Sequence, residues 1–154
     1  MRRRRPEKRT ILPDTKYDDL SVAKFINYIM DSGKKGVAEK IFYNAMDLIQ
    51  KKTKTDGLKI FKKGIENTSP SVEVKSRRIG GATYQVPIEV PKKRAFYLAS
   101  LWIINASKNS SGKPMSEKLA SELIAAANGD GNAIKKKEDT HRMADANKAF
   151  AHFR

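Results

Sequence analysis

Apolar residues at helical spacing constrain the fold of this chain more than any other feature of its sequence. In the segment 19–33, Val22, Phe25, Ile26, Ile29 and Met30 follow the i, i+3, i+4, i+7, i+8 spacing of a helix that is apolar on one side. Five later segments show similar patterns, separated by short stretches that contain Gly, Pro or Asn. We therefore predict six helices, which cover about residues 20–32, 37–52, 56–67, 91–108, 115–128 and 133–153.

The residues that flank the first predicted helix suggest where it begins and ends. Asp19 is a suitable N-cap, and Gly33 is a suitable residue to end the helix. We expect Lys34 and Lys35 to follow in a short exposed loop between two glycines, where their ammonium groups are free to approach a phosphate.

The apolar faces of the helices are interpreted as the core of a compact bundle. Trp102 and the phenylalanines lie on these faces, so stacking on nucleic-acid bases is not their expected role. Beyond the first helix, the predicted core residues are Ile41, Ala45, Leu48, Ile49, Leu58, Phe61, Ile65, Leu98, Trp102, Ile103, Leu119, Leu123, Ile124, Ala127, Met143, Ala146 and Phe150.

The segment 71–90, SVEVKSRRIGGATYQVPIEV, departs from the helical pattern and is typical of two strands around a glycine pair. Side chains alternate between faces along a strand, so the apolar residues of both strands are expected to share one face. This condition places Val74 opposite Val86 and requires a turn of odd length, with a glycine at positive φ. The opposite face would then carry Lys75, Arg77, Thr83 and Gln85, with Arg78 beside the tip.

The predicted fold is mainly α: a six-helix bundle with one protruding β-hairpin at about residues 72–90. Residues 1–12 form a basic arm, in which four consecutive arginines are followed by Lys8 and Arg9 with a single acid among them. Like charges at this density repel one another, so we expect the arm to stay disordered until it meets an anion. Residues 13–154 are predicted to form a single domain.

The charge balance indicates the kind of partner. The chain has 32 Lys and Arg against 17 Asp and Glu, which gives a formal net charge of +15. Such a charge attracts polyanions, with nucleic acid the leading candidate and an anionic membrane surface the second. The apolar faces are needed for the core, so a membrane-surface role ranks far lower. No apolar run approaches the roughly 20 residues that cross a bilayer and no signal peptide is visible, so we expect a soluble intracellular protein.

The sequence offers little for catalysis. It contains no Cys, which excludes disulfides, thiolate catalysis and Cys-bound metals. The pair Gly80–Gly81 is not followed by the Lys-Ser or Lys-Thr of a phosphate-binding loop, and NGDGNAIKKKED lacks the ligand order of a calcium loop. His141 and His152 are 11 residues apart, too far along a helix to share a metal ion. We predict no enzymatic activity, metal, cofactor or small-molecule substrate.

Three long segments resemble a known family. They are KFINYIMDSGKKGVAEKIFYNA at 24–45, VEVKSRRIGGATYQVPIEV at 72–90 and DTHRMADANKAFAHFR at 139–154. Each closely resembles the bacterial-type family of the seventh protein of the small ribosomal subunit. The similarity continues from about Arg9 to the last residue, in the same order and spacing.

The resemblance implies a structural constituent of the ribosome that takes part in translation. Members of this family have six helices and a protruding hairpin, bind the 3′ major domain of small-subunit rRNA and nucleate assembly of the subunit head. Their hairpin lies near the exit-site tRNA and the mRNA path, and they touch the ninth and eleventh proteins of the small subunit. The implied location is the cytoplasmic ribosome. Some members also repress translation of their own messenger.

The resemblance also suggests which residues face RNA. Their chemistry suits the role, because ammonium and guanidinium groups neutralise phosphates. The positions carried over for rRNA binding are Arg3, Arg4, Arg5, Lys8, Arg9, Lys34, Lys35, Lys75, Arg77, Arg78, Lys113, Lys135, Lys136, Lys137 and Arg142. The hairpin tip expected near tRNA and mRNA consists of Arg78, Ile79, Gly80, Gly81, Ala82 and Tyr84.

The chain departs from the family pattern at three places. Asp130 stands between the glycines of NGxG where a basic residue is common, and Leu101 precedes Trp102 where Arg is frequent. The chain also ends at Arg154, without the tail of many members. No RNA contact is carried over to Asp130, and no contact is carried over from a tail.

A free-standing regulator of DNA or messenger RNA is the alternative function, because such a protein would also be basic and helical. A regulator would prefer a short nucleic-acid sequence and would remain a free protein after nuclease treatment. A ribosomal protein should instead sediment with small subunits.

Overall fold

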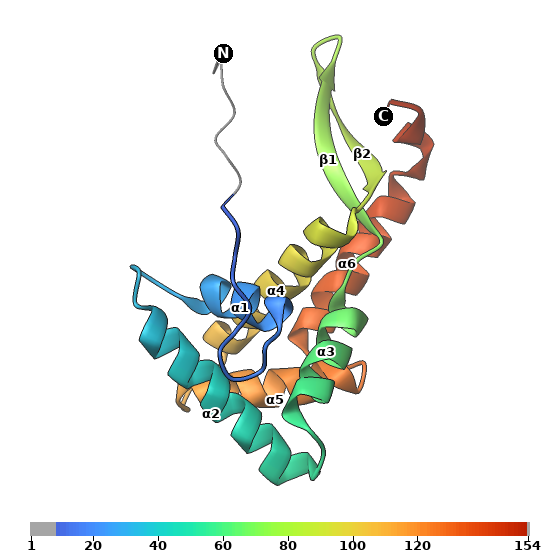
Figure 1. Cartoon of the computed structure of the whole chain (residues 1–154). Coiled ribbons are helices and arrows are strands. Elements are labelled where there is room, and N and C mark those ends of the chain that lie inside the picture. Colours follow the sequence, from blue (N-terminus) through green and yellow to red (C-terminus); the bar gives the residue numbers. More distant parts are fainter. Residues whose placement is uncertain (1–8, 154) are drawn as a thin grey trace. The chain divides into compact units, whose positions relative to one another are not determined.

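The computed structural model describes residues 9–153, and Figure 1 shows their helices and strands. Within this range the chain forms six α-helices, one antiparallel pair of strands and a terminal 3₁₀ helix, which confirms the predicted mainly α fold with one hairpin. The predicted basic arm falls mostly on residues 1–8, outside the described residues. The elements are α1 (Leu20–Ile29), α2 (Lys35–Thr53), α3 (Gly57–Thr68), β1 (Val72–Ile79), β2 (Ala82–Glu89), α4 (Lys92–Asn109), α5 (Met115–Ala127), α6 (Asn132–Ala146) and η1 (Lys148–Phe153).

Contacts between residues divide the chain into two compact units, Met1–Glu39 and Lys40–Arg154. The boundary lies within α2. Among the described residues, the first unit therefore contains the strap before α1 (residues 9–19), α1 itself and the first turn of α2. The second unit contains the rest of α2 and all later elements.

In the first unit, α1 begins at the predicted N-cap. The carboxylate of Asp19 accepts a hydrogen bond from the Ser21 N–H at 2.7 Å. The strap before the helix turns around Asp14, whose buried carboxylate accepts the N–H groups of Lys16 and Tyr17 at 3.1 and 3.0 Å. Of the predicted apolar face, Val22, Phe25, Ile26 and Ile29 are buried, while Met30 lies just after the helix and is half-buried.

The loop between α1 and α2 starts earlier and ends earlier than predicted. α1 ends at Ile29 rather than beside Gly33, because both Ser32 and Gly33 have positive φ and turn the chain. α2 already begins at Lys35, so only Lys34 of the predicted lysine pair lies in the loop. The expectation that both lysines occupy the loop is therefore wrong for Lys35.

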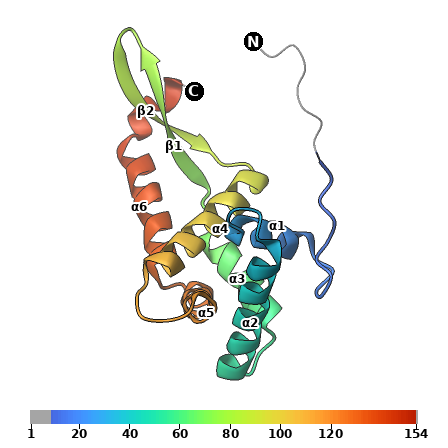
Figure 2. The ribbon, with the colours of Figure 1, turned by 90° about the vertical axis from the view of Figure 1, so that its left-hand side faces the viewer.

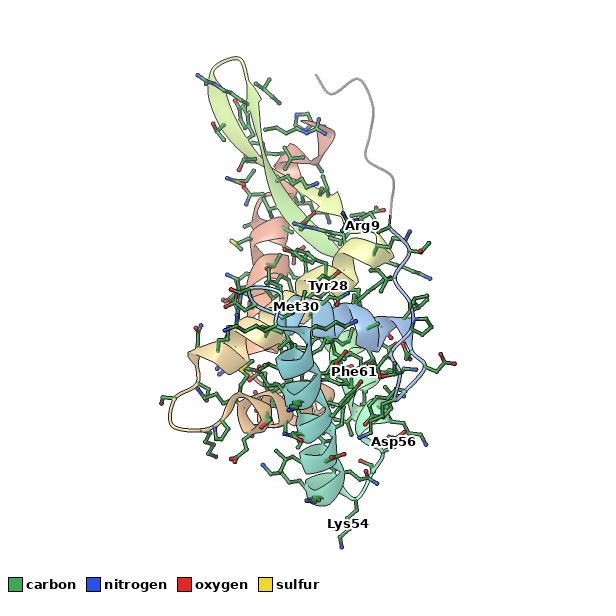
Figure 3. All side chains as sticks on the ribbon, turned by 60° about the vertical axis from the view of Figure 1, so that its left-hand side comes forward. Arg9, Tyr28, Met30, Lys54, Asp56 and Phe61 are labelled. Atoms are coloured by element: carbon green, nitrogen blue, oxygen red, sulfur yellow. The ribbon has the colours of Figure 1, made fainter. Side chains whose placement is uncertain are left out.

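In the second unit, the corner between α2 and α3 is closely packed. The rings of Phe42 and Phe61 are fully buried and meet edge to face, with centroids 5.4 Å apart at 88°. A Cβ on Gly57 would lie 2.8 Å from the carbonyl oxygen of Met46, so the close approach of α3 to α2 requires glycine there. Asp56 caps α3 by accepting a backbone N–H of its first turn at 3.1 Å. Figure 3 marks Asp56 and Phe61 on this corner.

α3 and α5 are held together by backbone and amide contacts. A Cβ on Gly64 would lie 3.2 Å from the carbonyl oxygen of Leu123, which is tighter than an ordinary contact. The Asn67 side chain donates to the carbonyl oxygens of Ala126 and Ala127, each at 3.0 Å. Carbonyl groups at the C-terminal end of a helix lack partners within that helix, so Asn67 satisfies two of these groups on α5.

The start of α6 is capped from α5. Glu122 Oε1 accepts the Ala133 N–H at 2.8 Å, and Gly131 precedes the helix with a φ of +102°. A Cβ on Gly131 would lie 2.9 Å from the same oxygen, so glycine both allows the turn and leaves room for the cap. Asp130 has a local role, since its carboxylate accepts the Gly131 N–H at 2.6 Å.

The predicted last helix and its core face differ from the structure. α6 ends at Ala146, and the chain continues as the 3₁₀ helix η1. Met143 is 49% exposed and Ala146 is also exposed, so their prediction as core is wrong. The buried face of α6 runs instead through Thr140 and Ala144, whose small side chains gave no strong apolar signal.

The remaining core predictions hold to differing degrees. Phe42 and Met46 are buried, but the apolar pattern of α2 did not single them out. The predicted residues Ala45, Ile49, Phe61, Ile65, Leu98, Ile103, Leu119, Leu123 and Ala127 are buried. Half-buried positions are Ile41, Leu48, Leu58, Trp102, Ile124 and Phe150.

The hairpin has a different register from the predicted one. Val74 lies opposite Pro87, which makes Gly80–Gly81 a two-residue turn. Both glycines have positive φ, +57° and +91°, as a type I′ turn requires, and the twist of this turn matches that of paired strands. The predicted odd-length turn with Val74 opposite Val86 is therefore wrong, while the predicted positive φ is confirmed. The backbone conformation of the two-residue glycine turn therefore decides the register, even though this register places the apolar residues of β1 and β2 on different faces.

The observed register changes which side chains share a face, because residues directly opposite one another point to the same side. The predicted separation of an apolar face from a basic face is therefore wrong, and the base of the hairpin has apolar residues on both faces. One face carries Lys75, Arg77, Tyr84, Val86 and Ile88, and the other carries Val72, Val74, Arg78, Thr83, Gln85 and Pro87.

α6 and η1 run beside the hairpin, as Figures 1 and 2 show. α6 contacts β1, and η1 contacts β2. The turn at the tip extends beyond η1 in both views. The hairpin therefore has a base covered by helices and a tip that reaches past them.

Candidate nucleic-acid interface

A buried carboxylate holds the base of the hairpin. Glu73 on β1 is 8% exposed, and its Oε2 lies 3.2 Å from the guanidinium of Arg94 on α4. Lys75 Nζ approaches the other carboxylate oxygen at 3.7 Å, although the Lys75 side chain is 59% exposed. Val86, on the same face, is fully buried. An acid within a basic hairpin therefore joins β1 to α4.

Two further contacts join the hairpin to α6 and η1. Nε2 of His141 on α6 accepts the N–H of Ser71, just before β1, at 3.2 Å. The rings of Tyr84 on β2 and Phe150 on η1 lie 5.3 Å apart between centroids, a typical separation for an aromatic pair. His141 thus has a structural role, and Tyr84, which the sequence assigned to the tip, is half-buried beside η1.

The tip of the hairpin is exposed on both faces. Arg77 and Arg78 are adjacent on β1, so their side chains point to opposite faces, and both are exposed. Ile79 is 38% exposed, and no atom of the described residues lies within 4 Å of a Cβ built on either glycine of the turn. The tip therefore presents guanidinium groups on two sides of a turn that a large partner can approach closely.

Three consecutive lysines lie in the first half of α6. Lys135 and Lys136 are exposed, whereas Lys137 is half-buried and its Nζ donates to the carbonyl oxygen of Asn67 at 2.5 Å. Lys137 also lines a shallow hollow of about 580 Å³, together with Lys63. Lys137 therefore joins α6 to α3 as well as adding positive charge to this surface.

The other predicted cations of the second unit are exposed and weakly paired. Arg142 on α6 is 79% exposed and lies 3.9 Å from Asp139, a separation at which an exposed ion pair adds little stability. Lys113 is exposed in the loop between α4 and α5. Both side chains can therefore turn toward an outside anion at little cost.

The first unit contributes three predicted cations. Lys34 is exposed, and Lys35 is 60% exposed with an ion pair to Glu39 at 3.9 Å. Arg9 lines a hollow of about 460 Å³ between the strap and α1, and Figure 3 marks it near the start of the described chain. The predicted residues Arg3, Arg4, Arg5 and Lys8 lie outside the described residues.

Sequence reasoning missed one dense basic segment. The end of α2, the turn after it and α3 carry six exposed lysines within residues 51–63, opposed there only by Asp56. Lys54 in the turn has a φ of +55°, and Figure 3 shows its side chain pointing away from the helices. The charge run QKKTKTDGLKIFKKG gave a visible signal for this segment. The segment consists of Lys51, Lys52, Lys54, Lys59, Lys62 and Lys63.

The exposed charged side chains of the described residues are mostly of a kind that binds anions. Among residues 9–153, no three His, Cys, Asp or Glu side chains gather as metal ligands would. No helix in that range is long and apolar enough to span a bilayer. Exposed cations occur on the hairpin, on α6 and in the loops, which is the surface expected of a basic helical protein that binds polyanions.

Comparison with known proteins identifies the family. The family model described as ribosomal protein S7p/S5e matches residues 1–148. The chain is 58% identical to the small ribosomal subunit protein uS7 of Gemmatimonas aurantiaca over 153 residues, which are 99% of this chain and 98% of that protein. It is 58% identical to uS7 of Thermotoga maritima over 154 residues, 100% of this chain and 99% of that protein. This chain belongs to the ribosomal protein S7p/S5e family, whose members are structural, non-enzymatic proteins of the ribosome, and the resemblance seen in the sequence is confirmed.

Proposed function

We propose that this protein is a structural constituent of the small ribosomal subunit that binds ribosomal RNA through its exposed cations. One observation supports this most strongly: among residues 9–153, every predicted RNA-facing cation except the half-buried Lys137 is exposed. Exposed ammonium and guanidinium groups neutralise phosphates and release counterions, which drives binding to nucleic acid. The names of the relatives indicate the same subunit.

The RNA partner in this proposal is the 3′ major domain, and binding starts the assembly of the subunit head in the cytoplasmic ribosome. The deep, narrow major groove of A-form RNA excludes side chains, so recognition of paired regions relies on shape and backbone. Arginine suits such contacts because its planar guanidinium matches two phosphate oxygens at once. The exposed pair Arg77 and Arg78 fits this requirement.

The hairpin tip is proposed to lie near the exit-site tRNA and the mRNA path. Its support is the exposed turn at Gly80–Gly81, where the lack of side chains permits close approach of a nucleic-acid backbone. The ninth and eleventh proteins of the small subunit are the proposed protein neighbours.

Binding to two rRNA fragments of equal length tests the proposal. The full chain should bind a 3′ major domain fragment more tightly than a 5′ domain fragment at the same salt concentration. If about 6–10 cations contact phosphate, the affinity should fall about 10³–10⁵-fold between 50 and 200 mM salt. Equal affinity for both fragments, or an affinity insensitive to salt, would contradict the proposal.

Sedimentation of cell extract separates this function from that of a free-standing regulator. A subunit constituent should sediment with small subunits and crosslink there to rRNA. A regulator of messenger RNA would stay in the slowly sedimenting fractions after nuclease treatment. That second outcome would replace the proposed function with the regulatory one.

A further inference from the structure

A small hollow lies between the C-terminal half of α4 and the beginning of α6, away from the hairpin tip. Its volume is about 290 Å³, roughly ten times the 30 Å³ that one water occupies in the liquid. Drug-sized ligands occupy pockets of about 300–1,000 Å³, so this hollow suits a smaller group. It is lined by Trp102, Asn105, Ala106, Asn109, Asn132 and Lys136.

Packing in the core accounts for only part of the Trp102 side chain. Its side chain is half-buried, and its indole N–H donates to no acceptor within residues 9–153. No buried side-chain nitrogen or oxygen of the described residues lacks a partner, so this N–H is exposed to solvent. Because Trp102 also lines the hollow, part of its indole ring is accessible to a ligand there.

Three amide side chains line the hollow together with Trp102. Asn105 and Asn109 are exposed one turn apart on α4, and Asn132 is exposed at the first position of α6. None of these amides has a hydrogen-bond partner within the described part of the chain. Each amide offers both donors and an acceptor, which are the groups that pair with the edge of a nucleobase. Their hydrogen-bonding groups are therefore available to an outside ligand.

Lys136 adds a positive charge at the rim of the hollow. Its side chain is exposed, and the ion pairs found among residues 9–153 do not include it. The ammonium group can therefore reach the phosphate that accompanies a base in the hollow. An aromatic ring, free amides and a cation are the combination by which proteins bind unpaired nucleotides of RNA.

We propose that this hollow binds one unpaired nucleobase of RNA, stacked on Trp102, with its edge hydrogen-bonded by the three asparagines and its phosphate contacted by Lys136. The inference rests on the proposed function, because it assumes that the chain binds RNA. It adds recognition of a base to an interface that otherwise contacts phosphates. It also revises the sequence-based interpretation of Trp102 as a core residue only.

Fluorescence reports directly on this site, because Trp102 is the only tryptophan of the chain. Titration of the full protein with a single-stranded RNA tetranucleotide should quench the tryptophan emission to a plateau. An abasic tetranucleotide with the same number of phosphates should cause little quenching at the same salt concentration. Equal quenching by both oligonucleotides would overturn the proposal, because only the first one carries bases.

Two variants separate stacking from packing. Trp102→Leu keeps an apolar side chain and should bind the tetranucleotide about 5- to 150-fold more weakly, the loss expected for removing one base–aromatic stack. Trp102→Phe keeps a ring and should lose less. If Trp102→Leu does not fold, Trp102→Phe and the quenching of the wild type still decide the question.

A double variant and a matched control variant test the proposed role of the asparagine side chains. The double variant Asn105→Ala, Asn132→Ala should lose its preference among tetranucleotides of different base, while Trp102 emission still reports binding. Asn44→Ala removes an exposed asparagine of α2 outside the hollow and should keep that preference. Unchanged preference in the double variant would overturn the assigned role of the amides.

The two proposals fail in distinguishable ways. If Trp102→Leu binds the 3′ major domain fragment and the tetranucleotide as tightly as the wild type, the hollow is not a base site and the proposed function stands. If the wild type itself binds no rRNA fragment, the proposed function fails, and the nucleobase site fails with it.

Discussion

The base and the tip of the hairpin belong to one ribbon, yet they depend on opposite kinds of partner. At the base, Glu73 and Val86 are buried, and the strands contact α4, α6 and η1. At the tip, Arg77 and Arg78 are exposed, and the described chain leaves open space around the turn. The protein therefore holds one end of the ribbon and leaves the other end to an outside partner.

Because the base is buried and the tip is exposed, substitutions at the two ends should affect different properties of the protein. A two-stranded hairpin alone is marginally stable in water, so the covered base must supply the stability that the tip lacks. Substitutions at the base should lower the free energy of unfolding. Substitutions of side chains at the tip should weaken RNA binding and leave the free energy of unfolding nearly unchanged.

The largest effect is expected from a polar group placed in the base. Val86→Asn removes a buried apolar side chain, worth about 1.5–3 kcal/mol, and buries an amide without a partner, which costs about 1–3 kcal/mol more. The free energy of unfolding should therefore fall by about 2.5–6 kcal/mol. Thr83→Asn is exposed near the tip and should change it by about 0.5 kcal/mol or less. Urea unfolding measures both values, and equal losses would erase the distinction between base and tip.

The sequence predicted the hairpin but not how its base is covered. Alternating valines and the glycine pair were sufficient to indicate two strands and a turn. The register depended on whether the apolar residues had to share one face. They do not, because helices distant in sequence cover the base, and Val86 and Pro87 are buried on opposite faces. The sequence pattern of the hairpin cannot show that helices from other parts of the chain bury its base.

The sequence predicted that the candidate interface is positively charged, but it did not predict the contacts that hold its side chains in place. Exposed cations follow from composition, since Lys and Arg are rarely fully buried. The contacts that position them join residues far apart in sequence: Glu73 and Arg94 are separated by 21 positions, and Asn67 and Lys137 by 70. The lysine segment is visible in the sequence as a charge run, whereas the family resemblance carries over other cations.

The next largest effect is expected at the ion pair that ties the base to α4. Arg94→Ala leaves the buried Glu73 carboxylate without its closest partner, so the free energy of unfolding should fall by about 1–3 kcal/mol. Adding Glu73→Gln removes the unpaired charge and should restore part of this loss. Lys93→Ala, an exposed neighbour on α4, should stay within about 0.5 kcal/mol of the wild type. A loss in Lys93→Ala as large as that in Arg94→Ala would mean that the ion pair does not hold the base.

The conformation of the turn, rather than its contacts, should determine how much stability a substitution there costs. Gly80 has a φ of +57° with open space around it, so Gly80→Val should cost about 1–2 kcal/mol through backbone strain alone. Gly80→Asn should cost less, because asparagine adopts this conformation more readily and Asn-Gly is a preferred pair for this turn. Thermal unfolding measures the cost, and NMR contacts between Val74 and Pro87 report the register. Similar stability in both variants would mean that the turn does not set the register.

The smallest change in stability is expected for Arg78, together with a clear change in RNA binding. Arg78→Ala should leave the free energy of unfolding within about 0.5 kcal/mol, because the side chain is exposed at the tip. It should lower the salt-dependence slope of rRNA binding by about 1, the effect of losing one phosphate contact. Arg78→Lys keeps the charge but loses the planar fork, so its affinity should fall between those of Arg78→Ala and the wild type. Lys40→Ala, an exposed lysine of α2 outside the proposed interface, should keep the wild-type slope. A loss of stability in Arg78→Ala with an unchanged slope would place this residue with the base, and the tip would then have no separate function in binding.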